Sequence, residues 1–331
     1  MGVRTNRFLA IAVLPLALLA GCMRGGENAP APVLQVAGST ATLEIAPVLL
    51  AARDHYPAGA SVRNGGIGNL VGAPRVEGLG DGTPADVATH AETQALRYSV
   101  ANPDIRIIMT VTEGSYRIVA RRSAGIARIA DLKGKRIATL STTSAGYFLS
   151  RMLESDGVRY DEVAAIRISP IEDMAGALQR REVDAVAIWE PHAGNALAVL
   201  GTDAISFPGD GIYRELFNLN TTAANLADPD KRARIVAFVR AVITASARIR
   251  AEPQTAQALV AQTGGFEMDE VVRAWPTLNF LAALPDDLLD VLVAEEQWLA
   301  KQEQRRSRDR ATLSRLIDPS ILAEATAQDA R

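Results

Sequence analysis

Four consecutive hydroxyl residues, Ser141, Thr142, Thr143 and Ser144, are the first feature of the sequence that could do chemistry. They follow residues 135–140, whose β-branched and apolar side chains are typical of a short buried strand, and they precede an apolar pattern of helical period. A helix that begins there offers free backbone N–H groups, hydroxyl donors and the positive end of its dipole, which together can hold a small anion. The alternative is that one hydroxyl caps the helix and the others are solvated.

A second hydroxyl pair, Ser39 and Thr40, stands in a similar context in the first half of the sequence. Residues 33–37 predict a strand, and residues 41–53 predict a helix with an apolar face. Pro47 either lies in the first turn of a helix that begins late or kinks the helix. Two hydroxyl-bearing helix starts, one in each half of the chain, favour a shared cleft for one ligand. Plain capping is the alternative for Ser39 and Thr40.

Trp189 and Glu190 directly follow residues 183–188, which predict a buried strand. The repeated strand–helix order favours an open, mainly parallel α/β sheet, in which ligands bind beyond the carboxyl ends of the strands. Trp189 could therefore stack on a flat ligand, or it could belong to the core. A carboxylate of Glu190 that faces the site would suit an ammonium or N–H group and repel a simple anion. Its alternative is a solvated carboxylate at a helix start.

Gly66 lies in a glycine-rich stretch, residues 64–69, that lets the backbone approach a ligand closely. The stretch lacks the lysine of a phosphate-binding P-loop and the spacing of a dinucleotide-binding loop. We interpret it as a tight turn near the cleft.

The N-terminus predicts export. Arg4 and Arg7 precede an apolar run, residues 8–20, that is too short to span a bilayer comfortably. Leu-Ala-Gly-Cys then resembles a bacterial lipoprotein signal, which predicts a signal peptide over residues 1–21 and a lipid on Cys22. Since Cys22 is the only cysteine, no internal disulfide can form. A chance cysteine beside an ordinary signal peptide is the alternative.

Composition sets broad limits on the protein. A chain of 331 residues can bury a sizeable core and form two lobes, and residues 22–32 read as a flexible tether before them. Its contents of 48% hydrophobic and 22% charged residues are ordinary for a globular protein. The formal net charge of −3 gives no basic surface, so we expect no nucleic-acid partner.

Residues 131–154 and 176–193 together resemble ABC-transporter periplasmic solute-binding proteins of the nitrate/sulfonate/taurine group, which includes thiamine-pyrimidine-like members. The first stretch contains Asp-Leu-Lys-Gly-Lys-Arg-Ile-Ala, then Ser-Thr-Thr and an apolar helix; the second contains Trp-Glu-Pro where the family commonly has Trp-Asp-Pro or Trp-Ala-Pro. The resemblance implies an α/β fold of the two-lobed periplasmic-binding-protein type II, with the ligand cleft between the lobes and the C-terminal helices on lobe 1. Lobe 1 would comprise residues 33–117 and 214–331, and lobe 2 residues 118–213.

The same resemblance adds candidates for the site. It implies that Thr89 and His90 line the lobe 1 side of the cleft and that Glu113 lies near the hinge and the cleft mouth. Residues 215–221 would form the return strand into lobe 1. For a lone histidine such as His90, a structural role is the alternative.

The function that the resemblance implies is that of a monomeric, lipid-anchored solute-binding protein in the periplasm or at the cell surface. It would capture a small sulfonate, taurine-like or related anionic or zwitterionic solute by lobe closure and deliver it to an ABC permease in the cytoplasmic membrane. Ser144 stands where taurine binders often have histidine, so a thiamine-related pyrimidine or another heteroaromatic solute is an alternative. A sensory binding protein is a further alternative.

Enzymatic activity is not expected. Related pyrimidine-synthesising enzymes carry a cysteine-rich motif, which this sequence lacks, and His55, His90 and His192 show no metal-ligand spacing. No nucleophile elbow or Ser–His–acid arrangement is visible either. We therefore predict no catalytic residues, no metal and no cofactor.

Overall fold

The computed structural model of the chain describes residues 1–2, 33–72 and 83–327. Cys22, the tether and nearly all of the predicted signal peptide lie outside the described residues, so their predictions are not tested. From Val33 onward the chain forms one unit, which contains two five-stranded sheets.

The first sheet has the strand order β2-β1-β3-β10-β4. β1 pairs in parallel with β2 and β3, whereas β10 runs antiparallel to β3 and β4. β10 is buried along its whole length, and its polar Asn218 accepts a hydrogen bond of 2.7 Å from the Thr110 hydroxyl. The strands are β1 (Leu34–Gly38), β2 (Ala60–Asn64), β3 (Val87–Ala91), β4 (Ile105–Gly114) and β10 (Glu215–Thr222).

The second sheet has the strand order β7-β6-β8-β5-β9, in which β6 pairs in parallel with β7 and β8 while β5 runs antiparallel to β8 and β9. The chain passes from the first sheet to the second between Gly114 and Tyr116 and returns between Pro208 and Glu215. The strands are β5 (Tyr116–Arg121), β6 (Arg136–Ala138), β7 (Ala164–Ile166), β8 (Ala185–Trp189) and β9 (Ala204–Pro208).

The prediction of mainly parallel sheets is therefore wrong for the ladders of β5 and β10. Both strands enter their sheet directly from the other sheet and not through a helical crossover, so nothing forces them to run parallel to their neighbours. The predicted return strand over residues 215–221 is confirmed as β10.

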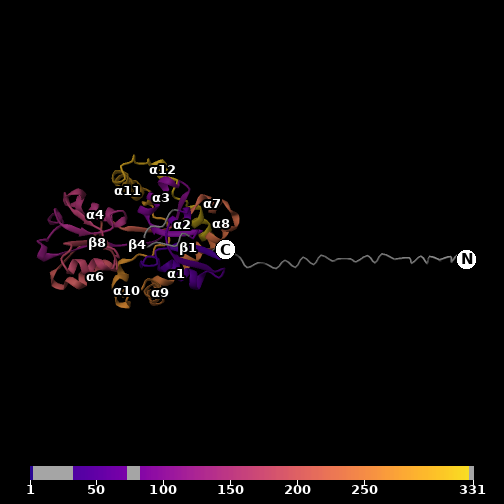
Figure 1. The fold of residues 1–331 in the computed structure, drawn as a ribbon, viewed down its shortest axis with the longest axis horizontal. Helices are drawn as coiled ribbons and strands as arrows, with labels where there is room; N and C mark the ends of the chain where they lie inside the picture. The colour runs from indigo at the N-terminus through magenta and orange to yellow at the C-terminus, as the bar shows by residue number, and fades with distance from the viewer. Residues whose placement is uncertain (3–32, 73–82, 328–331) are drawn as a thin grey trace. The chain divides into compact units, whose positions relative to one another are not determined.

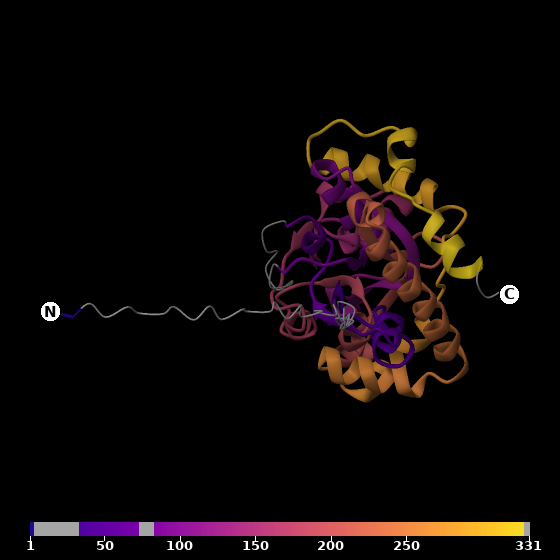
Figure 2. The ribbon, with the colours of Figure 1, turned by 90° about the vertical axis from the view of Figure 1, so that its right-hand side faces the viewer.

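Helices cover both faces of each sheet. They are α1 (Ala46–Leu50), α2 (Gly68–Val71), α3 (Glu92–Ala101), α4 (Ser144–Ser155), α5 (Asp173–Gln179), α6 (His192–Leu200), α7 (Ala223–Ala227), α8 (Pro229–Ala251), α9 (Gln254–Gly264), α10 (Met268–Ala274), α11 (Leu288–Gln302), α12 (Arg310–Ser314) and α13 (Ser320–Ala327). α4 and α6 pack on opposite faces of β8 (Figure 1). α3 and α8 cover the first sheet; α11 packs against α3, and α13 runs along α8 (Figure 2). The C-terminal helices therefore lie mainly on the first sheet. In the part of the chain that the structure describes, no helix has the length and apolar character needed to cross a membrane.

The first predicted helix begins later than expected. Residues 41–53 were expected to be helical, but α1 spans only Ala46–Leu50 and has Pro47 in its first turn. Pro47 fits there because the first N–H groups of a helix have no intrahelical partner, so its missing N–H is not needed. Ser39 and Thr40 lie in the turn before the helix and do not cap it. The expected pair of hydroxyl-bearing helix starts is therefore wrong in the first half of the chain.

Candidate functional site

A cavity of about 680 Å³ lies between elements of the two sheets. Ser39 follows β1 of the first sheet, and Thr142 follows β6 of the second; both line this cavity. Half of the ligand-binding residues predicted from the sequence line it, namely Ser39, His90, Thr142, Thr143, Ser144 and Trp189. The hydroxyl run after β6 and the loop after β1 thus meet at one site.

The start of α4 uses two of its hydroxyls internally. Thr143 caps the helix, because its Oγ1 accepts a hydrogen bond of 3.2 Å from the N–H of Ala145 and donates one of 2.9 Å to the Leu140 carbonyl. Ser144 is buried, and its Oγ lies 2.8 Å from the hydroxyl oxygen of Tyr116. Thr143 therefore both caps the helix and lines the cavity, while Ser144 lines the cavity with its hydroxyl bonded to Tyr116.

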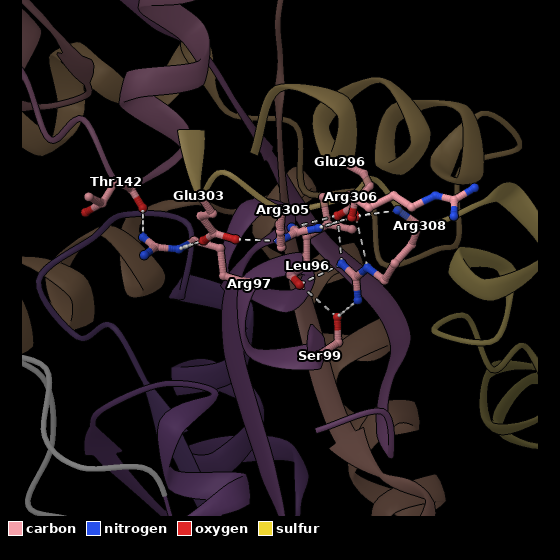
Figure 3. A network of polar contacts seen from close by, with 9 residues as sticks. All are labelled: Leu96, Arg97, Ser99, Thr142, Glu296, Glu303, Arg305, Arg306 and Arg308. Atoms are coloured by element: carbon pink, nitrogen blue, oxygen red, sulfur yellow. Dashed lines mark hydrogen bonds and ion pairs between the residues drawn. The ribbon is translucent and has the colours of Figure 1, made fainter. Parts of the chain in front are cut away.

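Thr142 is held from the other side of the cavity (Figure 3). Its carbonyl oxygen accepts a hydrogen bond from Nη1 of Arg97 and a longer one, of 3.4 Å, from Nε2 of Gln94. Nε of Arg97 lies 3.0 Å from Oε1 of Glu303. Gln94 and Arg97 belong to α3, and all four residues line the cavity. The Thr142 loop is thus connected to the helix that covers the first sheet.

The connection continues into a charged network formed by α11 and the segment that follows it (Figure 3). Arg305 contacts Glu303 at 2.7 Å and the fully buried side chain of Glu296 at 2.5 Å. Arg308 contacts Glu296 at 2.8 Å and donates a hydrogen bond to Ser99. Burial alone would raise the pKa of Glu296, but the hydrogen bonds from Arg308 and Arg305 outweigh it and lower that pKa to about 2. The network keeps Glu296 ionised and fixes the segment after α11.

Trp189 ends β8 and forms part of the cavity wall. Its ring centroid lies 5.7 Å from that of Tyr116, which lies 5.2 Å from Tyr213. The series continues through Tyr147 at 5.7 Å to Trp298 at 5.4 Å. These five rings form an aromatic chain from the cavity to α11, in which the two contacts of Tyr213 are edge-to-face and the two contacts of the tryptophans are tilted.

Glu190 is not placed to meet a ligand. Its side chain is buried, pairs with Nη2 of Arg117 at 2.6 Å and accepts a hydrogen bond of 2.9 Å from the N–H of Gly194 in α6. The residue does not line the cavity. Neither the ligand-facing interpretation nor a solvated carboxylate describes it; Glu190 stabilises the start of α6.

Five other predicted residues also lie outside the cavity lining: Thr40, Gly66, Thr89, Glu113 and Ser141. Glu113 pairs with Arg214 at 2.8 Å and accepts a hydrogen bond of 2.7 Å from Asn279. A Cβ on Gly66 would lie 2.6 Å from Nδ1 of His90, so this glycine gives room to a cavity-lining ring. Thr89 is fully buried, while Ser141 is exposed.

His90 contributes an uncharged ring to the cavity. Burial lowers the pKa of His90 to about 4, so the imidazole is neutral at pH 7. Its Nδ1 is buried without a hydrogen-bond partner among the described residues. Within residues 33–72 and 83–327, no group of His, Cys, Asp and Glu side chains is arranged to hold a metal ion.

Sequence reasoning missed four carboxylates in this cavity, Glu44, Glu172, Glu215 and Glu303, of which Glu44 and Glu215 are buried. Glu44 is 1% exposed and Glu215 is 6% exposed. Burial raises the pKa of Glu44 to about 7, and burial with the neighbouring charge of Glu44 raises the pKa of Glu215 well above its usual value. A signal for Glu44 was available, because it is a lone charge inside the apolar run Leu43–Glu44–Ile45–Ala46.

Two bacterial proteins named for binding aliphatic sulfonates are similar to this chain in sequence. A protein of Escherichia coli (strain K12) named for binding aliphatic sulfonates is 29% identical over 153 residues, which cover 45% of this chain and 45% of that protein. The chain thus matches less than half of that relative's length. A Bacillus subtilis (strain 168) protein, also named for binding aliphatic sulfonates, is 26% identical over 243 residues, which cover 71% of this chain and 73% of that protein.

Solved structures agree in fold. The periplasmic aliphatic sulphonate binding protein SsuA from Escherichia coli superposes with a TM-score of 0.65 at 16% identity, covering 86% of this chain and 92% of that one. The desulfurization enzyme DSZB superposes with a TM-score of 0.61 at 16% identity, covering 90% of this chain and 99% of that one. The predicted α/β periplasmic-binding-protein fold is confirmed. The model of the family described as "NMT1/THI5 like" matches residues 79–256, more than half of the sequence, and the chain therefore belongs to the NMT1/THI5-like family.

Proposed function

We propose that the chain is the solute-binding protein of an ABC importer, which captures a small sulfonate, taurine-like or related anionic or zwitterionic solute and delivers it to the permease. The observation that carries this proposal is a cavity that is lined both by Ser39, which follows β1 of one sheet, and by Thr142, which follows β6 of the other. Its relatives from two bacteria are named for binding aliphatic sulfonates, which supports the same solute class.

The anionic end of the solute would lie at the start of α4. That end of a helix of 12 residues favours negative charge, and Arg97, which donates a hydrogen bond to the Thr142 carbonyl, adds a positive side chain. Each hydrogen bond to a charged group contributes about 1.5–3 kcal/mol, so four or five suffice for micromolar affinity after ordering costs.

Capture would involve closure of two lobes, residues 33–117 with 214–331 and residues 118–213. A ligand that touches both walls of the cavity stabilises the closed state, because only there does it make all of its contacts. The hinge would lie at the crossings between the two sheets, near Ser115 and residues 209–214, since hinge motion is absorbed by a few residues at element ends.

We also propose where the protein is located. A lipid on Cys22 would tether a monomeric protein to the membrane on the periplasmic side or at the cell surface, within reach of a permease in the cytoplasmic membrane. We propose binding and not catalysis, since the relatives are named as binding proteins, although the desulfurization enzyme DSZB shares the fold.

A heteroaromatic solute, such as a thiamine-related pyrimidine, is the second candidate. One observation favours it: Trp189 lines the cavity, and its Nε1 is buried without a hydrogen-bond partner among the described residues. A flat ring would stack on the face of the indole, or a ring at its edge would accept a hydrogen bond from the N–H.

A thermal-shift screen of the mature protein, followed by calorimetry, tests the proposal. The panel would contain alkanesulfonates, taurine, nitrate, bicarbonate, pyrimidines and amino acids. We expect one or more sulfonates to raise the melting temperature and to bind with micromolar affinity. If pyrimidines alone bind, the second candidate replaces the first; if nothing in the panel binds, both are abandoned.

A further inference from the structure

Glu44 is a buried carboxylate that the protein leaves without a partner. It lies in the turn between β1 and α1, lines the cavity and is 1% exposed. Neither of its carboxylate oxygens has a hydrogen-bond partner within the described residues. The Thr42 hydroxyl and nearby backbone N–H groups are close enough to lower its pKa slightly, but burial has the larger, opposite effect.

Glu215 brings a second carboxylate to the same place. It is the first residue of β10, and both side chains lie over Gly114 at the end of β4. A Cβ on Gly114 would lie 2.9 Å from Oε2 of Glu215 and 3.0 Å from Oε1 of Glu44. Because Gly114 has no side chain, there is room for the two carboxylates to approach each other in the cavity lining.

The lining of the cavity also contains two arginines, Arg97 and Arg167. Among the described residues, no ion pair reaches Glu44 or Glu215, whereas Arg97 pairs with Glu303 and Arg117 pairs with Glu190. The nearby His90 is neutral at pH 7. Glu215 has a donor in the Tyr116 hydroxyl, but Glu44 has neither a cation nor a donor among the described residues. A buried carboxylate in that state is costly to keep, so its place in the cavity lining needs a reason outside packing.

We propose that Glu44, with Glu215 beside it, forms a subsite for a positively charged or N–H-donating nitrogen of the solute. The inference rests on the proposed function and narrows it. A solute whose anionic group lies at the start of α4 would place an ammonium or amino group on these carboxylates. The solute class is therefore an aminosulfonate-like zwitterion or an amino-substituted heteroaromatic ring, and not a plain alkanesulfonate.

The subsite would act by selection as well as by attraction. A solute without an N–H group leaves the Glu44 carboxylate buried and unpaired, or requires it to stay protonated. A site built to bind an N–H group discriminates strongly against analogues that lack it, because its buried acceptor then loses its partner.

Calorimetry with three matched probes tests the subsite: taurine, ethanesulfonate, which lacks the amine, and 4-aminopyrimidine, which lacks the sulfonate. The proteins are the wild type, Glu44→Gln and the control Glu182→Gln, whose carboxylate pairs with Arg180 at an exposed position. We expect the wild type and Glu182→Gln to bind taurine at least tenfold more tightly than ethanesulfonate. Glu44→Gln should lose tenfold or more in taurine affinity while ethanesulfonate binding does not weaken.

The outcomes separate this inference from the proposed function. If ethanesulfonate binds the wild type as tightly as taurine, the subsite is wrong and the sulfonate function stands. If only 4-aminopyrimidine binds and Glu44→Gln weakens it tenfold, the subsite stands and the sulfonate function is wrong. If no probe binds, both are wrong. Should Glu44→Gln fail to fold, Glu215→Gln is measured in its place. The ratio of the wild-type affinities for taurine and ethanesulfonate tests the subsite without any variant.

Discussion

The guanidinium of Arg97 donates a hydrogen bond to the carbonyl oxygen of Thr142, so α3 of the first sheet is joined to the loop that precedes α4 of the second (Figure 3). The contact lies at the cavity wall, where Arg97 also pairs with Glu303. A solute that enters the cavity meets a loop whose position is already set from the opposite side. Arg97 therefore links the shape of the cavity to the packing of α3 and α11.

Replacing Arg97 with methionine should weaken solute binding about tenfold, because the Thr142 loop loses its fixed position and the cavity wall loses a positive charge. The free energy of unfolding should fall by no more than about 1 kcal/mol, since the ion pair with Glu303 is partly exposed. Calorimetry and urea unfolding measure the two effects. Arg151→Met, which breaks the exposed pair with Glu154, is the control and should leave affinity unchanged.

Thr142→Ala and Trp189→Ala should each weaken binding of the solute by roughly tenfold, the loss expected from one good contact. Both variants should stay folded, because neither side chain is fully buried. Ser141→Ala is a matched control from the same hydroxyl run, since Ser141 is exposed and lies outside the cavity lining. Unchanged affinity in both Thr142→Ala and Trp189→Ala would remove these residues from the site.

Glu190→Gln should destabilise the protein without changing its affinity. The substitution removes the charge that pairs with Arg117 and perturbs the acceptor for the Gly194 N–H, so we expect a loss of about 2–3 kcal/mol in the free energy of unfolding. Glu182→Gln, at the exposed pair with Arg180, should cost less than about 1 kcal/mol. A tenfold loss of affinity in a stable Glu190→Gln protein would instead restore Glu190 to the ligand site.

Two glycines in helices should respond differently to alanine. A Cβ on Gly146 of α4 would lie 2.4 Å from the Ser141 carbonyl oxygen, so the hydroxyl loop must move. We expect Gly146→Ala to lower both the melting temperature and the affinity. A Cβ on Gly176 of α5 would meet only the end of the Arg180 side chain, so Gly176→Ala should be neutral or stabilise by up to about 1 kcal/mol. Equal melting temperatures for the two variants would contradict the close packing of the loop on α4.

Stability should depend on pH through Glu44. Its pKa is about 7 in the folded protein and near 4.5 ordinarily, so the folded state holds a proton that the unfolded chain releases. This contribution to stability is complete below about pH 4.5 and is lost as the pH rises to about 7. Unfolding curves between pH 4.5 and 7 should therefore show stability falling, and Glu44→Gln should reduce that slope by at most about 1.4 kcal/mol per pH unit.

Glu296 changes the stability in the opposite direction with pH. With its pKa lowered to about 2, it stabilises the fold above about pH 4.5, and that contribution is lost as the pH falls toward 2. A stability profile that rises steadily from pH 4.5 to 7 would contradict the effect of Glu44, whereas a loss of stability below pH 4.5 agrees with that of Glu296.

Much of the fold could be predicted from the sequence, because the spacing of apolar residues and the family motifs are both contained in short stretches of the chain. The strand–hydroxyl–helix order from residue 135 to Ser155 and the return strand at Glu215 were both visible in this way. The direction of β5 and β10 was not, because it depends on where the chain crosses between sheets. The late start of α1 depended on Pro47, for which the sequence allowed two outcomes.

The site was less predictable, because partners distant in the sequence decide what a side chain does. Glu190 follows its strand as a ligand residue would, yet Arg117, far away in the sequence, neutralises it. Glu44 looked like one charge in an apolar run, and only the cavity and the glycine at position 114 give it a role. Thr143 caps α4 and also lines the cavity, so its capping role does not exclude the predicted contact with a ligand.

The aromatic chain that begins at Trp189 gives the unlabelled protein an optical signal. Of the three tryptophans, Trp189 alone lines the cavity, while Trp275 and Trp298 are buried in the packed interior. Tyr116 and Tyr213 lie close enough to pass excitation energy toward the indoles at either end. Arrival of a solute changes the surroundings of the Trp189 indole directly, so a change in the intensity or wavelength of tryptophan emission would report occupancy without any attached dye.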